Sequence, residues 1–195
     1  MTISAPHMHA SCLEALQDHL YAGARVLDVG SGSGYLTACM GVMVKPDGVA
    51  YGIEHVPELV SWSEQNMQKS SVGKELVEAG NVVSVGKRGD SCCMEERRLT
   101  VVTMPIPQVF VVGDGRKGLP EHAPFDCIHV GAASPHEPRE LMNQLKVGGR
   151  LIVPVGTYKQ EMLQIDRVSE TQWKNSTLMG VQYVPLTDLQ TQLNW

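Results

Sequence analysis

The chain has few aromatic side chains, no excess of basic residues and no long apolar run. Aromatic residues make up 5% of its 195 positions, and the formal net charge is −5. This charge gives no electrostatic reason for binding to nucleic acid or to an anionic membrane. No apolar stretch is long enough to cross a bilayer. We therefore expect a globular protein without nucleic-acid or membrane partners.

Cysteine pairs of the kind that bind zinc or carry out redox reactions are also missing. The five cysteines are odd in number and show no C-x-x-C spacing, which argues against a disulfide framework and against a metal site. Adjacent Cys92 and Cys93 are interpreted as incidental loop residues, because no neighbour favours a thiolate. The chain opens without a basic region followed by an apolar core, so we expect a reduced, cytosolic protein.

The chain does contain short apolar segments that alternate with stretches of helical periodicity. The predicted strands are residues 25–29, 48–55, 108–115, 125–132 and 149–156. The predicted helices include residues 35–44, 57–70 and 137–146. This alternation predicts an α/β fold with a doubly wound, mostly parallel sheet. Two further apolar segments follow without a helix between them and predict a C-terminal antiparallel hairpin. We expect a single domain over residues 1–195.

The most informative motif is "LDVGSGSGYLT" (27–37), a glycine-rich turn directly after a strand. Its glycines let the backbone approach a ligand closely, and the helix that follows offers unpaired N–H groups. Tyr35 stands where a dinucleotide-binding fingerprint has its third glycine, which counts against NAD and FAD.

Three acidic residues lie at the ends of successive predicted strands. Asp28 precedes the glycine turn, and Glu54 ends the second strand, where a carboxylate can accept both hydroxyls of a ribose. Asp114 follows the third strand and is placed to meet an adenine amino group. Ordinary solvated strand ends are the alternative. The shared edge of the sheet favours a nucleoside-binding site.

These motifs resemble the protein-L-isoaspartate (D-aspartate) O-methyltransferase family, which has the Rossmann-like fold of class I S-adenosylmethionine-dependent methyltransferases. The matching stretches are "TISAPHMHA", "LDVGSGSGYLTA", "GIEHVPELV", "VVGDGRKGLPEHAPFDCIHVGAA", "LKVGGRLIVPVG" and "LMGVQYVPLTD". The resemblance implies transfer of a methyl group from S-adenosylmethionine to the free α-carboxylate of isoaspartyl and D-aspartyl residues. The product would be S-adenosylhomocysteine, and the partners would be aged peptides and proteins.

The resemblance also implies roles for individual residues. Ser4 would be the catalytic hydroxyl that meets the substrate carboxylate. The cofactor would be bound by Thr2, Ile3, Ser4, His9, Asp28, Gly30, Ser31, Gly32, Ser33, Gly34, Glu54, His55, Asp114, Gly115, Thr187 and Gln192. Without the motif, Ser4 would be interpreted as a helix cap and His9 as a helix-face residue. His129 is interpreted as structural.

The chain departs from the family pattern in two places. Family members carry a helical segment before "TIS", and its absence here leads us to expect a truncated chain with Ser4 on an untethered terminus. Residues 72–107 form an extra stretch, because α/β connections normally take about two to six residues. Within it, "VVSVGKRGD" (82–90) resembles "VFVVGDGRKG" (109–118) and competes for the same place in the sheet. The second segment is the preferred third strand.

Three alternatives to an active isoaspartyl methyltransferase stay open at this point. The first is a non-catalytic form that keeps the fold and the cofactor site. The second is a methyltransferase with another substrate, and the third is a nicotinamide-dependent oxidoreductase. For the leading interpretation we expect a monomer.

Overall fold

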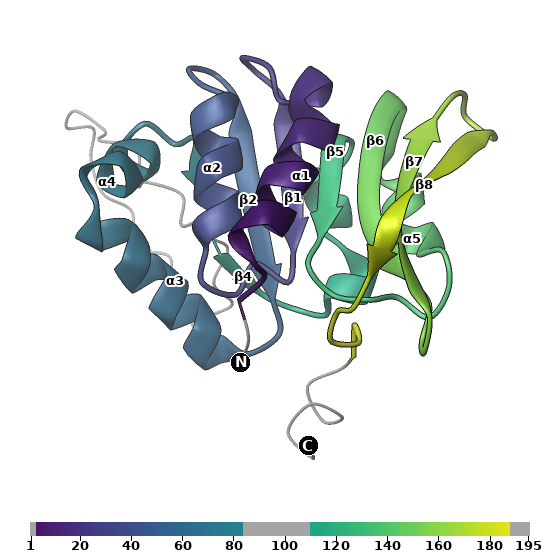
Figure 1. Cartoon of the computed structure of the whole chain (residues 1–195). Helices are drawn as coiled ribbons and strands as arrows, with labels where there is room; N and C mark the ends of the chain where they lie inside the picture. The colour runs from purple at the N-terminus through teal and green to yellow at the C-terminus, as the bar shows by residue number, and fades with distance from the viewer. Residues whose placement is uncertain (1–2, 84–109, 188–195) are drawn as a thin grey trace, which may run out of the picture.

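The computed structural model describes residues 3–83 and 110–187, and its centre is one twisted sheet (Figure 1). The strands are β1 (Arg25–Val29), β2 (Val49–Glu54), β3 (Val82–Val83), β4 (Phe110–Val112), β5 (Phe125–Val130), β6 (Leu145–Val155), β7 (Gln160–Arg167) and β8 (Trp173–Val181). Their order is β3-β2-β1-β5-β6-β7-β8, and β4 also pairs with β2. Strands β1 to β6 pair in parallel, whereas β7 and β8 are antiparallel. The predicted fold class is confirmed.

Helices cover both faces of this sheet, as a doubly wound fold requires. They are α1 (Pro6–Leu16), α2 (Tyr35–Met43), α3 (Pro57–Lys69), α4 (Ser71–Glu78) and α5 (Arg139–Asn143). Apolar side chains of α1 to α4 pack in one core cluster with Val26 and Cys127. Those of α5 pack in the other cluster with Leu27 and Ile128, the next residues along the same strands. Successive side chains of β1 and β5 therefore point into opposite cores.

Two elements differ in length from their sequence predictions. The helix predicted at 137–146 is only α5, because Pro138 precedes its first turn and residues from Leu145 onward pair with β5. Strand β6 accordingly begins before the two glycines of "VGGR", where Gly148 has a left-handed φ of 85°. The apolar residues before these glycines fit either periodicity, so pattern alone assigned them to the helix.

Part of the predicted extra stretch 72–107 has regular structure. Helix α4 begins after Ser70, whose hydroxyl accepts a hydrogen bond of 2.8 Å from the N–H of Gly73. Strand β3 follows and pairs with Ala50 and Tyr51 of β2. Residues 84–109, which include Cys92 and Cys93, lie outside the described residues.

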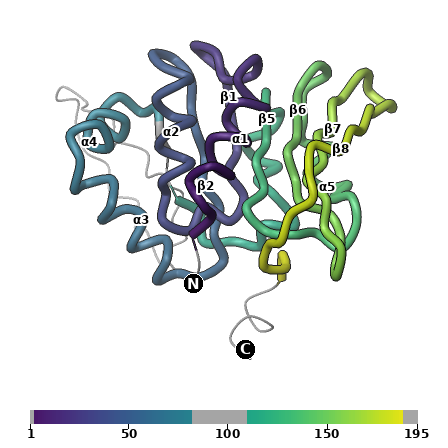
Figure 2. Tube along the Cα trace, viewed as in Figure 1, coloured from purple at the N-terminus to yellow at the C-terminus, as the bar shows by residue number. Residues whose placement is uncertain are grey.

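The ends of the described chain lie at the same edge of the sheet (Figure 2). The segment after β8 returns to the loop that follows β5, where Leu186 donates a hydrogen bond of 2.8 Å to the carbonyl of Ala133. Within residues 3–83 and 110–187, no helix is long and apolar enough to cross a membrane. In the same residues, no group of three His, Cys, Asp or Glu side chains is placed to hold a metal ion.

Candidate active site

The glycine turn after β1 has the conformation that its sequence predicts. Gly30, Gly32 and Gly34 have φ angles of 77°, 52° and 78°, a region that L side chains rarely adopt. The N–H of Gly30 donates to the carbonyl of Ile53 at 2.8 Å, which ties the turn to the end of β2. The N–H of Gly131 donates to Val29 at 2.8 Å and ties the end of β5 to β1. The turn therefore lies where three strands end.

Two cavities meet at this turn, since Gly30, Gly32 and Gly131 line both. The first is lined by Glu54 and by residues of the neighbouring elements, which are Ile53, His55, Leu59, Gly115, Ala132, Val184, Pro185 and Leu186. The second is lined by Ile3, Ser4, His9, Asp28, Ser31, Ser33, Leu36 and His129. The two cavities together form one elongated site at the carboxyl edge of the sheet.

Glu54 is the fixed acceptor of the first cavity. One carboxylate oxygen accepts a hydrogen bond of 3.2 Å from the N–H of Gly32. The other accepts from the N–H groups of His55 and Val56 at 2.9 and 3.3 Å. The side chain is 6% exposed. A buried carboxylate held by three backbone donors cannot rotate freely, so it presents its remaining lone pairs in a defined direction, as recognition of two vicinal hydroxyls requires.

Ser4 lies in the second cavity and does not cap α1. The cap position belongs to Ala5, and no side chain caps this helix. His9 and Tyr183 lie close to Ser4: against the effect of burial, the backbone of Ser4 acts to raise the pKa of His9, and the side chain of Ser4 acts to lower the pKa of Tyr183. The expectation of an untethered Ser4 stays a prediction, although α1 begins only two residues later, at Pro6.

Two buried polar atoms near the turn have no hydrogen-bond partner in the described part of the chain: the Nε2 atom of His9 and the hydroxyl of Ser31. Both residues line the second cavity. Unpaired polar atoms in a closed core are costly, and they are explained where a polar ligand completes them. With the glycine turn and Glu54, they fit a nucleoside that carries an amino-acid end, which is the chemistry of S-adenosylmethionine.

Two of the predicted acids have protein partners of their own. Asp28 lines the second cavity, but it accepts 2.6 Å and 2.8 Å hydrogen bonds from Thr37 and His129. Asp114 forms a two-point pair with Arg116, with distances of 2.9 and 2.8 Å, and this pair lowers the pKa of Asp114. Asp114 does not line the first cavity, although its neighbour Gly115 does.

The remaining predicted residues fall into four groups. His55 and Ser33 line a cavity. Gly34 lies in the turn with a left-handed φ and packs against the ring of Phe110. Thr187 directly follows Leu186, which lines the first cavity. Thr2 and Gln192 lie outside the described residues.

Sequence reasoning missed some lining residues. They are Ile53, Leu59, Gly131, Ala132, Val184, Pro185 and Leu186, together with Leu36 and His129, which line the second cavity. The signal for them was their membership of the matched motifs: Ile53 and Leu59 lie in "GIEHVPELV", and the "VGA" and "VPL" stretches lie in two others.

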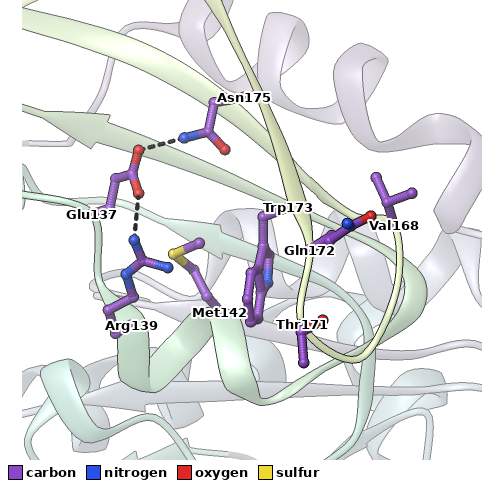
Figure 3. Close-up of a pocket in the computed structure, with 8 residues that line it drawn as sticks. All are labelled: Glu137, Arg139, Met142, Val168, Thr171, Gln172, Trp173 and Asn175. Atoms are coloured by element: carbon purple, nitrogen blue, oxygen red, sulfur yellow. Dashed lines mark hydrogen bonds and ion pairs between the residues drawn. The ribbon is translucent and has the colours of Figure 1, made fainter.

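A wider cavity of about 440 Å³ lies between α5 and the β7–β8 turn (Figure 3). Figure 3 shows Trp173 on its wall, and the guanidinium groups of Arg139 and Arg167 lie 5.9 and 5.7 Å from the ring centroid. Glu137 is paired with Arg139 and accepts a hydrogen bond from Asn175. No sequence-predicted site residue lines this cavity, so we place the active site at the glycine turn.

Comparisons with known proteins identify the family of the chain. The family model "Protein-L-isoaspartate(D-aspartate) O-methyltransferase (PCMT)" matches residues 1–191. The chain is 46% identical over 192 residues to the protein-L-isoaspartate O-methyltransferase of Triticum aestivum, covering 98% of this chain and 72% of the relative. It is 43% identical over 195 residues to that of Caenorhabditis elegans, covering 99% and 74%.

A solved structure is similar over the same length. The protein-L-isoaspartate O-methyltransferase from Plasmodium falciparum, in complex with S-adenosyl-L-homocysteine, superposes with a TM-score of 0.72 and 29% identity. The match covers 96% of this chain and 76% of that one. The glycine turn, the Glu54 cavity and the Ser4 cavity thus occur in a chain that belongs to the protein-L-isoaspartate(D-aspartate) O-methyltransferase family.

Proposed function

We propose that this chain transfers the methyl group of S-adenosylmethionine to the free α-carboxylate of isoaspartyl residues, and of D-aspartyl residues, in peptides and proteins. One observation carries the assignment of roles: Glu54 and Ser4 line two cavities that share the same glycine turn. A cofactor that spans both would place its adenosyl end near Glu54 and its reactive end near Ser4.

The proposed reaction does not require the residues near Ser4 to act as general acids or bases. A substrate α-carboxylate is ionised at neutral pH and is already a nucleophile. When bound, S-adenosylmethionine supplies a methyl group on a sulfonium, and the C–S electron pair stays on sulfur while the carboxylate oxygen forms the new C–O bond. No general base and no general acid are needed for this transfer.

Positioning and removal of water are the tasks left to the chain. Ser4 lies near His9 and Tyr183 and lines the second cavity, so its hydroxyl is placed to donate to a carboxylate there. Holding two reactants in line lowers the barrier by about 7–11 kcal/mol in favourable cases. The methyl ester would then cyclise to a succinimide, whose hydrolysis returns some normal aspartyl linkage, so the proposed role is protein repair. The monomeric state and the cytosolic location stay predictions of the sequence.

The test uses paired peptides that differ only in one linkage. The chain is incubated with methyl-labelled S-adenosylmethionine and either an isoaspartyl or an aspartyl peptide, and methanol released by alkali is counted. We expect release from the isoaspartyl peptide alone. Calorimetric titration with S-adenosylhomocysteine runs in parallel. Binding without methanol release would identify the non-catalytic alternative, and release from both peptides would point to another substrate class.

Ser4→Ala tests the role of the hydroxyl. We expect methyl transfer to slow about 10- to 100-fold, because the carboxylate loses its directional contact, while affinity for S-adenosylhomocysteine stays within twofold. Ser11→Ala is the matched control, since Ser11 lies on the same helix and lines neither of the two cavities. A wild-type rate for Ser4→Ala would remove this residue from the reaction.

A further inference from the structure

A buried charged pair lies in the wall of the Ser4 cavity, and the proposed reaction leaves it without a task. The Nδ1 atom of His129 is 2.8 Å from one carboxylate oxygen of Asp28, and the side chains are 5% and 2% exposed. The second oxygen of Asp28 accepts a 2.6 Å hydrogen bond from Thr37. Both members of the pair line the cavity that contains Ser4.

The pair is held rigidly between three elements. Asp28 comes from β1, His129 from the adjacent position of β5, and Thr37 from α2. Cys12 of α1 also lies close to the His129 ring. Burial alone would lower the pKa of His129, but the hydrogen bond with Asp28 and the nearby Cys12 raise it to about 10. The 2.8 Å contact and the raised pKa of His129 together favour a protonated imidazole facing Asp28.

The other titratable groups around the pair are Cys12, His9 and Cys39. His9 of α1 lines the same cavity, and burial together with the charge of His129 lowers its pKa, so it is neutral. Burial raises the pKa of Cys39 of α2, which stays a thiol. Among the described residues that line the two cavities, there is no lysine or arginine. Among the described residues that line the two cavities, His129 is therefore the side chain placed to compensate the negative charge of Asp28.

The reaction brings an anion into this cavity, because the substrate reacts as a carboxylate. An uncompensated Asp28 would repel that carboxylate and would attract the positive charge of the cofactor, both in surroundings from which water is largely removed. We propose that His129 is a positioning residue that neutralises Asp28, so that the cavity admits the substrate carboxylate. This inference rests on the proposed role of Ser4, which places the substrate there.

If His129 neutralises Asp28, loss of its positive charge should have effects of opposite sign on two ligands, the isoaspartyl peptide and S-adenosylmethionine. His129→Gln keeps a hydrogen-bond donor near Asp28 but removes the positive charge. At pH 8 we expect the KM for an isoaspartyl peptide to rise about tenfold. S-adenosylmethionine should gain about threefold in affinity relative to S-adenosylhomocysteine, which lacks the sulfonium charge. A loss of packing alone would weaken both nucleosides equally.

Two further variants separate charge from geometry. Asp28→Asn/His129→Gln makes the pair neutral again, so the ratio of the two nucleoside affinities should return to the wild-type value. His9→Gln is the matched control, because it replaces an imidazole that is already uncharged. It should leave that ratio unchanged even where both affinities fall.

Calorimetry measures the ratio of the affinities for S-adenosylmethionine and S-adenosylhomocysteine, and so it tests the inference without requiring turnover. A changed ratio in His129→Gln that returns in the double variant supports it, even if the full chain proves inactive. An unchanged ratio in His129→Gln overturns it while leaving the proposed function intact. If His129→Gln does not fold, His129→Asn serves in its place with the same expectation, and an unchanged ratio there overturns the inference equally.

Discussion

The centre of the sheet and the position beyond β2 are built from equally apolar segments, but only the centre is continuous. Strand β1 pairs with β2 over all its residues and with β5 over four of them. The position beyond β2 is shared by two pieces. Val82 and Val83 pair with Ala50 and Tyr51, and Phe110 pairs with the next residue, Gly52.

The two pieces therefore follow one another in register, although residues 84–109 separate them in the chain. The sequence interpretation treated "VVSVGKRGD" and "VFVVGDGRKG" as rivals for this place. Treating the two segments as alternatives was wrong, because both pair with β2: β3 pairs with Ala50 and Tyr51, and β4 pairs with the residues from Gly52 onward. An apolar pattern identifies a segment that can pair, but it does not say how much of the neighbouring strand each segment will cover.

The largest effect on ligand binding is expected where the continuous centre meets the ligand. Gly32→Val places a β-branched residue at a φ of 52° in the turn that both cavities share. Such a residue is strained there, and the turn would have to move away from Glu54. We expect affinity for S-adenosylhomocysteine to fall more than about 100-fold by calorimetry, at about 2.8 kcal/mol or more. Unchanged affinity would refute this location of the turn.

Phe110→Ala tests whether the position beyond β2, which β3 and β4 share, contributes as much to the free energy of unfolding as the centre of the sheet. Phe110 is fully buried, and a Cβ added at Gly34 or Gly52 would lie 2.7 or 2.6 Å from its ring. The ring of Phe110 therefore packs closely against Gly34 of the turn and Gly52 of β2. We expect the free energy of unfolding to fall by about 3–5 kcal/mol in urea titrations. Leu27→Ala in β1, where Leu27 is also fully buried, is the comparison and should cost about 2–5 kcal/mol. A loss below about 1 kcal/mol for Phe110→Ala would show that β4 contributes little.

Deletion of residues 84–109 would make the divided position continuous. Val83 would be joined to Phe110 with the register that both already have on β2. Because a long connection no longer has to be closed, we expect the free energy of unfolding to rise by about 2 kcal/mol, with nucleoside binding retained.

The matched control is deletion of residues 85–110, which is equally long. It would put Ser84 in the place of Phe110 and is expected to destabilise the protein. Equal stability of the two deletion variants would contradict the register argument.

The smallest effect is expected at the opposite edge of the centre. Asp126 of β5 accepts hydrogen bonds from Tyr21, from the N–H of Arg25 and from Lys146, at 2.6, 2.8 and 2.7 Å. Burial alone would raise the pKa of Asp126, but these bonds lower it below its usual value. Its contribution to stability is therefore complete above about pH 4 and is lost as the pH falls through the lowered pKa.

Asp126→Asn should lower the free energy of unfolding by about 1.5 kcal/mol at pH 7. The difference from wild type should shrink as the pH is lowered below 4. Thermal melts between pH 7 and pH 3 measure this, and a difference that stays constant with pH would assign the loss to something other than the charge of Asp126.

How far the sequence could be interpreted depended on whether the signal was local. The glycine turn and Glu54 were predicted because a turn and a strand end are encoded by adjacent residues. The pairing of Asp114 with Arg116 was not, although the residues are two apart, because a carboxylate alone does not reveal its partner. The contacts of Ser4 with Tyr183 and of His129 with Asp28 join distant parts of the chain, so no local pattern could have predicted them.

The central claim is that one bound nucleoside spans both cavities, and a crystal structure of this chain with S-adenosylhomocysteine tests it most directly. The account predicts ribose hydroxyls on the carboxylate of Glu54 and the sulfur atom in the cavity of Ser4, with polar contacts to His9 or Ser31. A nucleoside bound away from the glycine turn, for example against Trp173, would contradict it.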